Sequence, residues 1–196
     1  MQTEIEAKFL DIDFEKLRKK LKELGADCIN PMRLMRRKNF DFPDKRLEKI
    51  GGWVRVRDEG DKITLSYKQL SNRTLHGTKE VSVKVGDFKA SCSLLSAIGL
   101  VENSYQETKR ESWILDGAQV ELDKWPWVKP FLEVEAKDEE HIKTTVAKLG
   151  LLWKDAYHGS VESVYMAEYN VTEQEIDEIP KILFTEVPGW LSKRRK

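Results

Sequence analysis

The chain has 196 residues, of which 35% are charged, and its 34 basic side chains balance its 34 acidic ones. This length suits one domain with a buried core. A formal net charge of zero argues against a general nucleic-acid binder, which is normally basic throughout. No apolar run approaches the roughly 18 residues of a membrane span, and the polar N-terminal stretch lacks the apolar centre of a signal peptide. We therefore expect a cytoplasmic protein that binds neither nucleic acid nor membrane.

Cysteine and histidine offer no candidate metal site. Cys28 and Cys92 lie far apart and lack the spacing of metal ligands, and the three histidines are scattered. We expect both thiols to be reduced and mostly buried, as in a typical cytosolic protein. Any bound metal must then be held by oxygen ligands.

Strands alternate with a few helices along the chain. Alternating apolar and polar residues predict strands over residues 4–9, 33–42, 53–57, 62–68, 80–85, 104–115, 119–124 and 131–137. Apolar residues at helical spacing predict helices over 13–24, about 87–98 and 139–149, each followed by a glycine that suits a helix end. About eight strands against three or four helices predict an α+β fold dominated by an antiparallel sheet.

Several of these strands carry charges where a strand is usually apolar. Segments 4–9 and 131–137 each place two glutamates and one lysine at alternate positions, and segment 53–57 places two arginines there. Successive side chains of a strand point to opposite faces, so the charges of each strand share one face. By this parity, the charged faces hold Glu4, Glu6, Lys8, Arg55, Arg57, Lys62, Lys68, Glu80, Lys84, Arg110, Glu121, Asp123, Glu133, Glu135 and Lys137.

The opposite faces are apolar and need helices or more sheet to cover them. A closed barrel of about eight strands leaves an interior wide enough for side chains or one small ligand. Unpaired charges taken out of water cost several kcal/mol per ion, so an interior lined by acids and bases requires ligands. Carboxylates without cysteine or histidine suit hard cations such as Mg²⁺ or Mn²⁺, whereas arginine and lysine suit phosphate oxygens. The charged faces therefore suit a divalent-metal complex of a polyphosphate.

The first strand, Glu4-x-Glu6-x-Lys8, resembles the ExExK signature of the CYTH family, also called triphosphate tunnel metalloenzymes. The later family residues follow in the family's order: Phe40-Asp41, Arg55-x-Arg57, Lys68, Glu80, Arg110, Asp123 and Glu133-x-Glu135. The resemblance spans roughly residues 4–169. It implies a closed or nearly closed eight-stranded antiparallel β-barrel with helices packed outside, a requirement for Mg²⁺ or Mn²⁺, and activity on triphosphates.

The chain departs from the family pattern in two strands. Arg36-Arg37-Lys38-Asn39 stands where many members have an acidic residue and a tyrosine, and Thr108 stands where a second lysine is common. We expect residues 1–170 to form the tunnel domain and 171–196 to form a C-terminal helical extension with a basic tail. The last four residues, 193–196, are expected to be a frayed, solvated end.

The charges give most of the matching residues an expected role, and parity adds Lys84 to them. Glu4, Glu6, Glu133 and Glu135 are the expected metal ligands. The expected substrate ligands are Lys8, Arg55, Arg57, Lys68, Lys84 and Arg110. Glu80 and Asp123, with Lys8, are the catalytic candidates, either completing a metal shell or orienting the attacking group. Residues 125–127, Trp-Pro-Trp, are expected to pack against the barrel rim rather than to stack on a base.

The attacking nucleophile decides the reaction. Water attacking the terminal phosphorus gives a divalent-metal-dependent triphosphatase, which is the leading hypothesis. A ribose hydroxyl attacking the α-phosphorus gives a class IV adenylyl cyclase, the first alternative. A non-catalytic polyphosphate- or nucleotide-binding module is the second, and the four metal-type glutamates argue against it. The expected partner is a triphosphate-containing small molecule, and a homodimer is left open.

Overall fold

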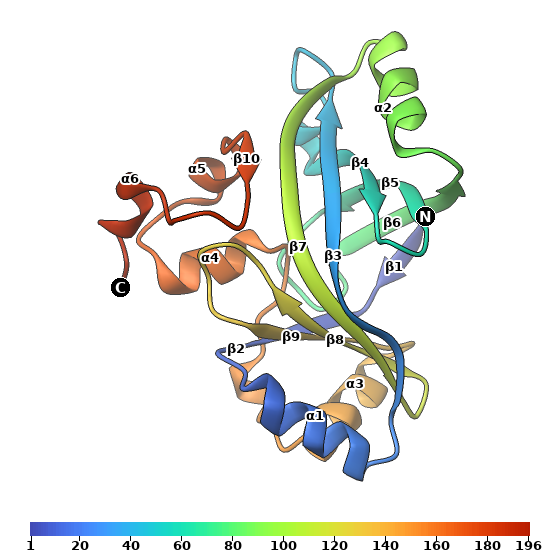
Figure 1. Ribbon diagram of the computed structural model, residues 1–196, viewed down its shortest axis with the longest axis vertical. Helices are drawn as coiled ribbons and strands as arrows, with labels where there is room; N and C mark the ends of the chain where they lie inside the picture. Colours follow the sequence, from blue (N-terminus) through green and yellow to red (C-terminus); the bar gives the residue numbers. More distant parts are fainter.

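The computed structural model describes all 196 residues and contains one antiparallel sheet that curls almost into a closed barrel (Figure 1). Around the sheet the strand order is β1-β6-β5-β4-β3-β7-β8-β9-β2. The strands are β1 (Gln2–Glu4), β2 (Glu6–Leu10), β3 (Asp27–Asp41), β4 (Gly52–Asp58), β5 (Ile63–Leu70), β6 (Thr78–Val85), β7 (Val101–Leu115), β8 (Ala118–Lys124), β9 (Phe131–Glu135) and β10 (Lys181–Ile182).

The first chain segment joins the two edges of this sheet. β1 pairs with β6, and β2, which follows after a single interruption at Ile5, pairs with β9. Counted as two halves of one strand, β1 and β2 complete an eight-stranded antiparallel barrel, which confirms the expected fold class. The short β10 pairs in parallel with the first half of β7, at Tyr105 and Gln106, beyond the part of β7 that pairs with β8.

The two longest strands, β3 and β7, run nearly the full height of the molecule side by side (Figure 1). β3 begins at residue 27, earlier than the expected residue 33, because its first residues find partners in the second half of β7. Register shifts at three places in this pair, the last between Asn39 and Phe40, let the long strands bend with the barrel.

Helices cover one part of the barrel wall. α1 (Phe14–Glu23) and α3 (Glu139–Lys148) lie against the outer faces of β2, β8 and β9 at one end of the molecule (Figure 1). Their N-termini are capped by Asp13 and Asp138, whose carboxylates accept backbone N–H groups. The largest core cluster joins side chains of these helices, such as Leu21 and Ile142, to outward residues of the strands, such as Val120. None of the helices is long and apolar enough to cross a membrane.

α2 (Phe88–Ala97) covers the other end, where Leu95 packs with Phe40 and Val56. The outer face of β6 remains uncovered, with Val81 and Val83 49% and 54% exposed. The expectation that helices cover every apolar strand face is therefore wrong for β6.

The C-terminal part packs along one side of the barrel (Figure 1). It contains α4 (Glu162–Glu168), α5 (Glu173–Asp177), β10 and α6 (Gly189–Ser192). Ile176, Ile182 and Leu191 join a second core cluster with barrel-rim residues such as Phe131. The frayed tail expected for residues 193–196 is wrong, because the backbone N–H of Lys196 donates to Glu168 and that of Asn170 donates to the carbonyl of Arg194.

The two cysteines are free, but the expected burial is wrong. Cys28 is exposed near the start of β3, and Cys92 is half-buried on α2.

Candidate active site

The barrel encloses a cavity of about 820 Å³, lined mainly by polar and charged side chains. Most of the site residues expected from the sequence share it. Those that line the cavity are Glu4, Glu6, Lys8, Arg55, Arg57, Lys68, Glu80, Arg110, Glu133 and Glu135.

One side of the cavity, formed by β1, β2 and β9, carries Glu4, Glu6, Glu133 and Glu135, which we call the carboxylate wall. Two lysines reach into it. The Nζ of Lys68 lies 2.8 Å from Glu4 and 2.9 Å from Glu80, and the Nζ of Lys8 lies 2.7 Å from Glu6. Lys8 also donates to the carbonyl of Gly159 at 2.7 Å.

Lys8 is 3% exposed and remains a cation. Burial alone would lower its pKa, but Glu6 and Glu133 outweigh burial and hold the pKa above its usual value. Lys8 is therefore suited to binding an anion and is a poor base at neutral pH.

At two members of the carboxylate wall, burial outweighs the stabilisation of the charged form by nearby cations. Burial, assisted by contact with Glu80, raises the pKa of Glu4 to about 8. Burial and the charges of Glu133 and Glu6 raise the pKa of Glu135 to about 7, and Glu135 forms no ion pair. Without a further cation these carboxyl groups retain protons near neutral pH.

The carboxylate wall has the donor chemistry of a hard divalent cation, because it supplies only oxygen ligands and carries excess negative charge. As the side chains lie, no group of three or more acidic, histidine or cysteine residues is close enough together to hold a metal ion. Glu4 and Glu6 are instead turned toward Lys68 and Lys8. Binding a cation would require these glutamates to exchange lysine contacts for metal contacts.

The facing side, formed by β3, β4 and β7, carries Arg37, Arg55, Arg57 and Arg110, which we call the arginine wall. In the strand order, β3 lies four strands from the β1–β2 segment in either direction, so the two walls face each other across the barrel. Arg55 is 6% exposed, and its closest acidic partner, Glu80, is 3.5 Å away. Burial and the charge of Arg57 lower the pKa of Arg55 to about 10, so it still carries its charge at neutral pH.

Two other arginines of this wall are held by buried acids. Both Nε and Nη2 of Arg57 donate to Glu59, at 3.0 and 2.7 Å. Arg110 donates to both oxygens of Asp123, at 2.7 and 2.6 Å. Such two-point contacts fix the plane and direction of a guanidinium group.

Asp123 is 1% exposed and does not line the cavity. Burial raises its pKa to about 6 despite the pairing with Arg110, so it is ionised at neutral pH. Its position behind Arg110 suits a residue that orients this arginine, rather than one that contacts a substrate directly.

The expected substrate ligand Lys84 does not reach the cavity. It lies near the end of β6, is exposed, and faces Thr64 in the strand register. Because side chains alternate along a strand, Lys84 lies on the same face of β6 as Glu80. The strand, however, leaves the enclosed part of the barrel before residue 84. The structure therefore gives no support to its expected role.

The structure adds Glu59 to the site and shows what Asp41, one of the family residues, contacts. Glu59, which lies just beyond the expected strand over 53–57, is 4% exposed and lies inside the cavity. Asp41 accepts hydrogen bonds from the backbone N–H groups of Phe42, Leu47 and Glu48 at 2.6, 3.1 and 2.8 Å. It thereby fixes the loop that leads into β4, the strand of Arg55 and Arg57.

The aromatic residues near the cavity differ in what they offer a ligand. Trp125 also lines the cavity, but it is 4% exposed, packs in the second core cluster and has the guanidinium of Arg37 over its ring. Trp53 lies on the same face of β4 as Arg55 and lines the cavity, half-buried. Trp53 lies two residues before Arg55, so the alternation of side chains along the strand already places it on the charged face.

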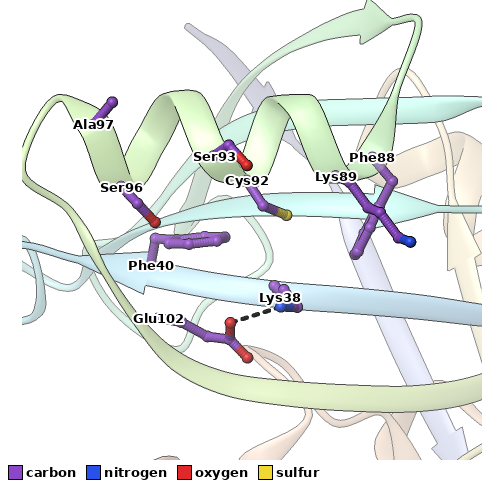
Figure 2. Close-up of a pocket in the computed structure, with 9 residues that line it drawn as sticks. All are labelled: Lys38, Phe40, Phe88, Lys89, Cys92, Ser93, Ser96, Ala97 and Glu102. Atoms are coloured by element: carbon purple, nitrogen blue, oxygen red, sulfur yellow. Dashed lines mark hydrogen bonds and ion pairs between the residues drawn. The ribbon is translucent and has the colours of Figure 1, made fainter.

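A second cavity, of about 800 Å³, lies between α2 and the strands β3 and β7 (Figure 2). Phe40 and Cys92 point into it, and Lys38 and Glu102 form an ion pair at 2.7 Å along its strand side. Because this pair neutralises its own charges, the second cavity offers no converging set of charges for a polyanion. The barrel interior is the better candidate site.

Comparison with known proteins agrees with this geometry. Residues 2–163 match the CYTH domain family, and the sequence has no match among the curated proteins. The PH1012 protein from Pyrococcus horikoshii OT3 has a similar structure, with a TM-score of 0.67 and 22% identity over 82% of this chain and 98% of that one.

Two further structures share the fold at lower identity. A proposed adenylate cyclase from Vibrio parahaemolyticus has a TM-score of 0.72 and 15% identity, covering 84% of this chain and 98% of that one. A proposed adenylyl cyclase from Hippeastrum with a dominant triphosphatase activity has a TM-score of 0.60 and 17% identity, covering 92% of this chain and 97% of that one. The family match takes in every strand from β1 to β9 and both charged walls. The chain is therefore a member of the CYTH family.

Proposed function

We propose that this protein is a divalent-metal-dependent hydrolase of triphosphate substrates bound in the barrel. The observation that carries this proposal is the pair of opposed walls, four arginines facing four glutamates in one cavity of about 820 Å³. Binding of an anion alone would need only the arginines and lysines. The carboxylate wall gives the cavity a place for the cation that accompanies a polyphosphate.

The arginine wall would hold the phosphoryl groups and offset the charge that develops as phosphate is transferred. Positioning and electrostatic stabilisation are the main contributions of a protein to this reaction. Arg57 and Arg110 are already oriented by Glu59 and Asp123, so little reordering is needed before they meet a substrate. A divalent cation bound by Glu4, Glu6, Glu133 and Glu135 would supply charge neutralisation at the phosphate oxygens.

Glu80 is the better placed of the two candidates for orienting the attacking group. It lines the cavity, whereas Asp123 does not. Although burial opposes ionisation, contacts with Glu4, Lys68 and Arg55 hold the pKa of Glu80 below its usual value. An ionised carboxylate at this position can accept a hydrogen bond from an attacking water molecule.

A class IV adenylyl cyclase remains the second candidate, and Trp53 is the observation that favours it. Its indole presents a flat apolar surface on the face of β4 that carries Arg55. A triphosphate that carries a base could stack there. The relative from Hippeastrum, which has a dominant triphosphatase activity, supports ranking hydrolysis first.

The test is product analysis with Mg²⁺ or Mn²⁺ and, separately, ATP, thiamine triphosphate and inorganic tripolyphosphate. We expect phosphate release that stops in excess EDTA. Cyclic AMP with pyrophosphate would favour the cyclase, and binding without turnover would favour the non-catalytic module. Full turnover in EDTA would exclude the divalent-metal requirement. An exposed glutamate, Glu140, provides the matched control variant for substitutions in the carboxylate wall.

A further inference from the structure

Arg37 differs from every other cation in the cavity wall. Nine lysine and arginine residues line the cavity, and eight of them have a carboxylate oxygen within 4.0 Å. Arg37 has none, although its side chain is only 8% exposed. It lies in the segment 36–39, where the sequence departs from the family pattern.

Uncharged groups hold the Arg37 side chain in place. Its Nη2 donates to Oγ1 of Thr108 at 3.2 Å, and its guanidinium carbon lies 4.5 Å from the ring centre of Trp125. Its Nε has no hydrogen-bond partner. These contacts fix the orientation of the group while leaving its charge uncompensated.

The surroundings make this charge costly. Arg37 faces Arg57 directly in the register of β3 and β4. Burial, followed by the charges of Arg55, Arg57 and Arg110, lowers the pKa of Arg37 well below its usual value. A buried ion without a partner costs several kcal/mol, and an oxyanion bound beside it would remove that cost.

We propose that Arg37 is an additional phosphate-binding residue of the barrel, which contacts a phosphoryl oxygen of the polyphosphate chain next to those held by Arg57. The proposal rests on the proposed function and deepens it. It gives all four guanidinium groups of the arginine wall a role in binding the substrate. The fourth, that of Arg37, belongs to the segment where this chain departs from its family. Thr108 and Trp125 then act as positioning residues for Arg37.

The competing explanation is that Arg37 only fills space against Trp125. The two explanations differ in what removal of the charge does to the ligand-free protein. A packing residue stabilises the empty barrel, whereas an unpaired buried cation beside three other arginines destabilises it.

The experiment compares Arg37→Gln with Arg36→Gln, which changes the neighbouring, exposed arginine of the same strand. Binding of inorganic tripolyphosphate is measured by calorimetry in EDTA, where metal-dependent turnover cannot interfere. We expect Arg37→Gln to weaken binding by about tenfold or more, as for the loss of a charge-assisted hydrogen bond. Arg36→Gln should change the affinity by less than about twofold, as for an exposed charge. Equal affinities in the two variants would overturn the proposal.

The melting temperature of the ligand-free variants is the second readout. Arg37→Gln should leave it unchanged or raise it, because glutamine can still donate to Thr108 without carrying a charge. A lower melting temperature with unchanged affinity would show a packing role and overturn the proposal. If both quantities fall, Arg37→Lys decides, since a phosphate ligand predicts that restoring the charge regains part of the affinity. No regain would also overturn it.

These outcomes separate the inference from the proposed function. If the wild-type protein binds and hydrolyses tripolyphosphate while Arg37→Gln binds it equally well, the inference alone fails. If the wild-type protein neither binds tripolyphosphate nor hydrolyses any triphosphate, both fail together.

Discussion

The two walls of the barrel respond to burial in different ways. On the carboxylate wall, Glu4 and Glu135 have pKa values raised to about 8 and about 7, so these groups reduce their charge by keeping protons. An arginine cannot reduce its charge in this way near neutral pH, because its guanidinium remains protonated. Arg55 therefore stays charged even where burial lowers its pKa to about 10.

This difference has a consequence for the ligand-free protein. Glu4 and Glu135 can lose their charge by keeping protons, whereas Glu133 stays ionised because Lys8 and Arg110 hold its pKa below its usual value against burial. The arginine wall needs partners such as Glu59 and Asp123. Arg37 lacks such a partner, so a cavity-lining cation without a carboxylate partner lies on β3, opposite the β1–β2 segment. The arginine wall is thus ready for an anion, whereas the carboxylate wall must lose protons before it receives a cation.

The largest expected effect comes from breaking the carboxylate wall. Glu133→Ala should reduce turnover of tripolyphosphate by at least about a hundredfold, because it removes an expected metal ligand. Glu6→Ala should do the same, and Glu140→Ala on the exposed surface of α3 should have no effect. Steady-state rates at saturating Mg²⁺ measure this. A variant of the carboxylate wall that keeps full activity would show that the wall is not a metal site.

A smaller effect is expected from the arginine wall. Arg57→Ala should weaken tripolyphosphate binding by about 1.5–3 kcal/mol, since it removes a charge-assisted contact in a partly desolvated cavity. Lys62→Ala should matter much less, because that side chain is 40% exposed at the end of the cavity, where solvent screens its charge. Calorimetry on both variants checks this, and equal losses would contradict the difference in solvent exposure between these two cavity-lining side chains.

Binding of a ligand with its metal should stabilise the folded protein, because it compensates the buried charges of both walls. Tripolyphosphate with Mg²⁺ at a hundredfold excess over the dissociation constant stabilises the folded state by about 2.7 kcal/mol. For a chain of this length, that raises the melting temperature by roughly 5–10 °C. Orthophosphate and AMP should raise it far less, because they reach fewer of the cations. A thermal scan with each addition is the measurement, and no shift with millimolar tripolyphosphate would remove the ligand-binding role of both walls.

The smallest expected effect is a pH dependence of the metal-free protein. The pKa of Glu135 is raised to about 7 by burial and by Glu133 and Glu6, so the folded state holds a proton that the unfolded chain releases nearer pH 4.5. Ionisation of Glu135 therefore lowers the free energy of unfolding as the pH rises from about 4.5 through 7. Glu135→Gln removes this dependence.

Melting curves in EDTA at several pH values test this sign. Wild type and Glu135→Gln should unfold at similar temperatures at pH 5, and the variant should be more stable by a few degrees at pH 8. The exposed control Glu140→Gln should follow the wild type throughout. A variant that is less stable than wild type at pH 8 would show that the ionised Glu135 stabilises the fold.

Much of this arrangement follows from the sequence by itself. The backbone of a strand sends successive side chains to opposite faces, so the alternating charges of segments 4–9, 53–57 and 131–137 determine which faces of their strands carry charge. The order of these strands, with the helices between them, gave the α+β barrel. The expected helices over 13–24, 87–98 and 139–149 each appear within a few residues of those bounds.

Only the tertiary structure decided which of these charges are enclosed. Lys84 has the parity of Glu80 but lies where β6 has left the enclosed part of the barrel, and Glu59 lies in a turn that folds back beside Arg57. Arg37 shares the period-two face of β3 with Asn39 and Asp41, yet its lack of a partner depends on which strands surround it. Alternation is a property of one strand, whereas enclosure and compensation are properties of the whole barrel.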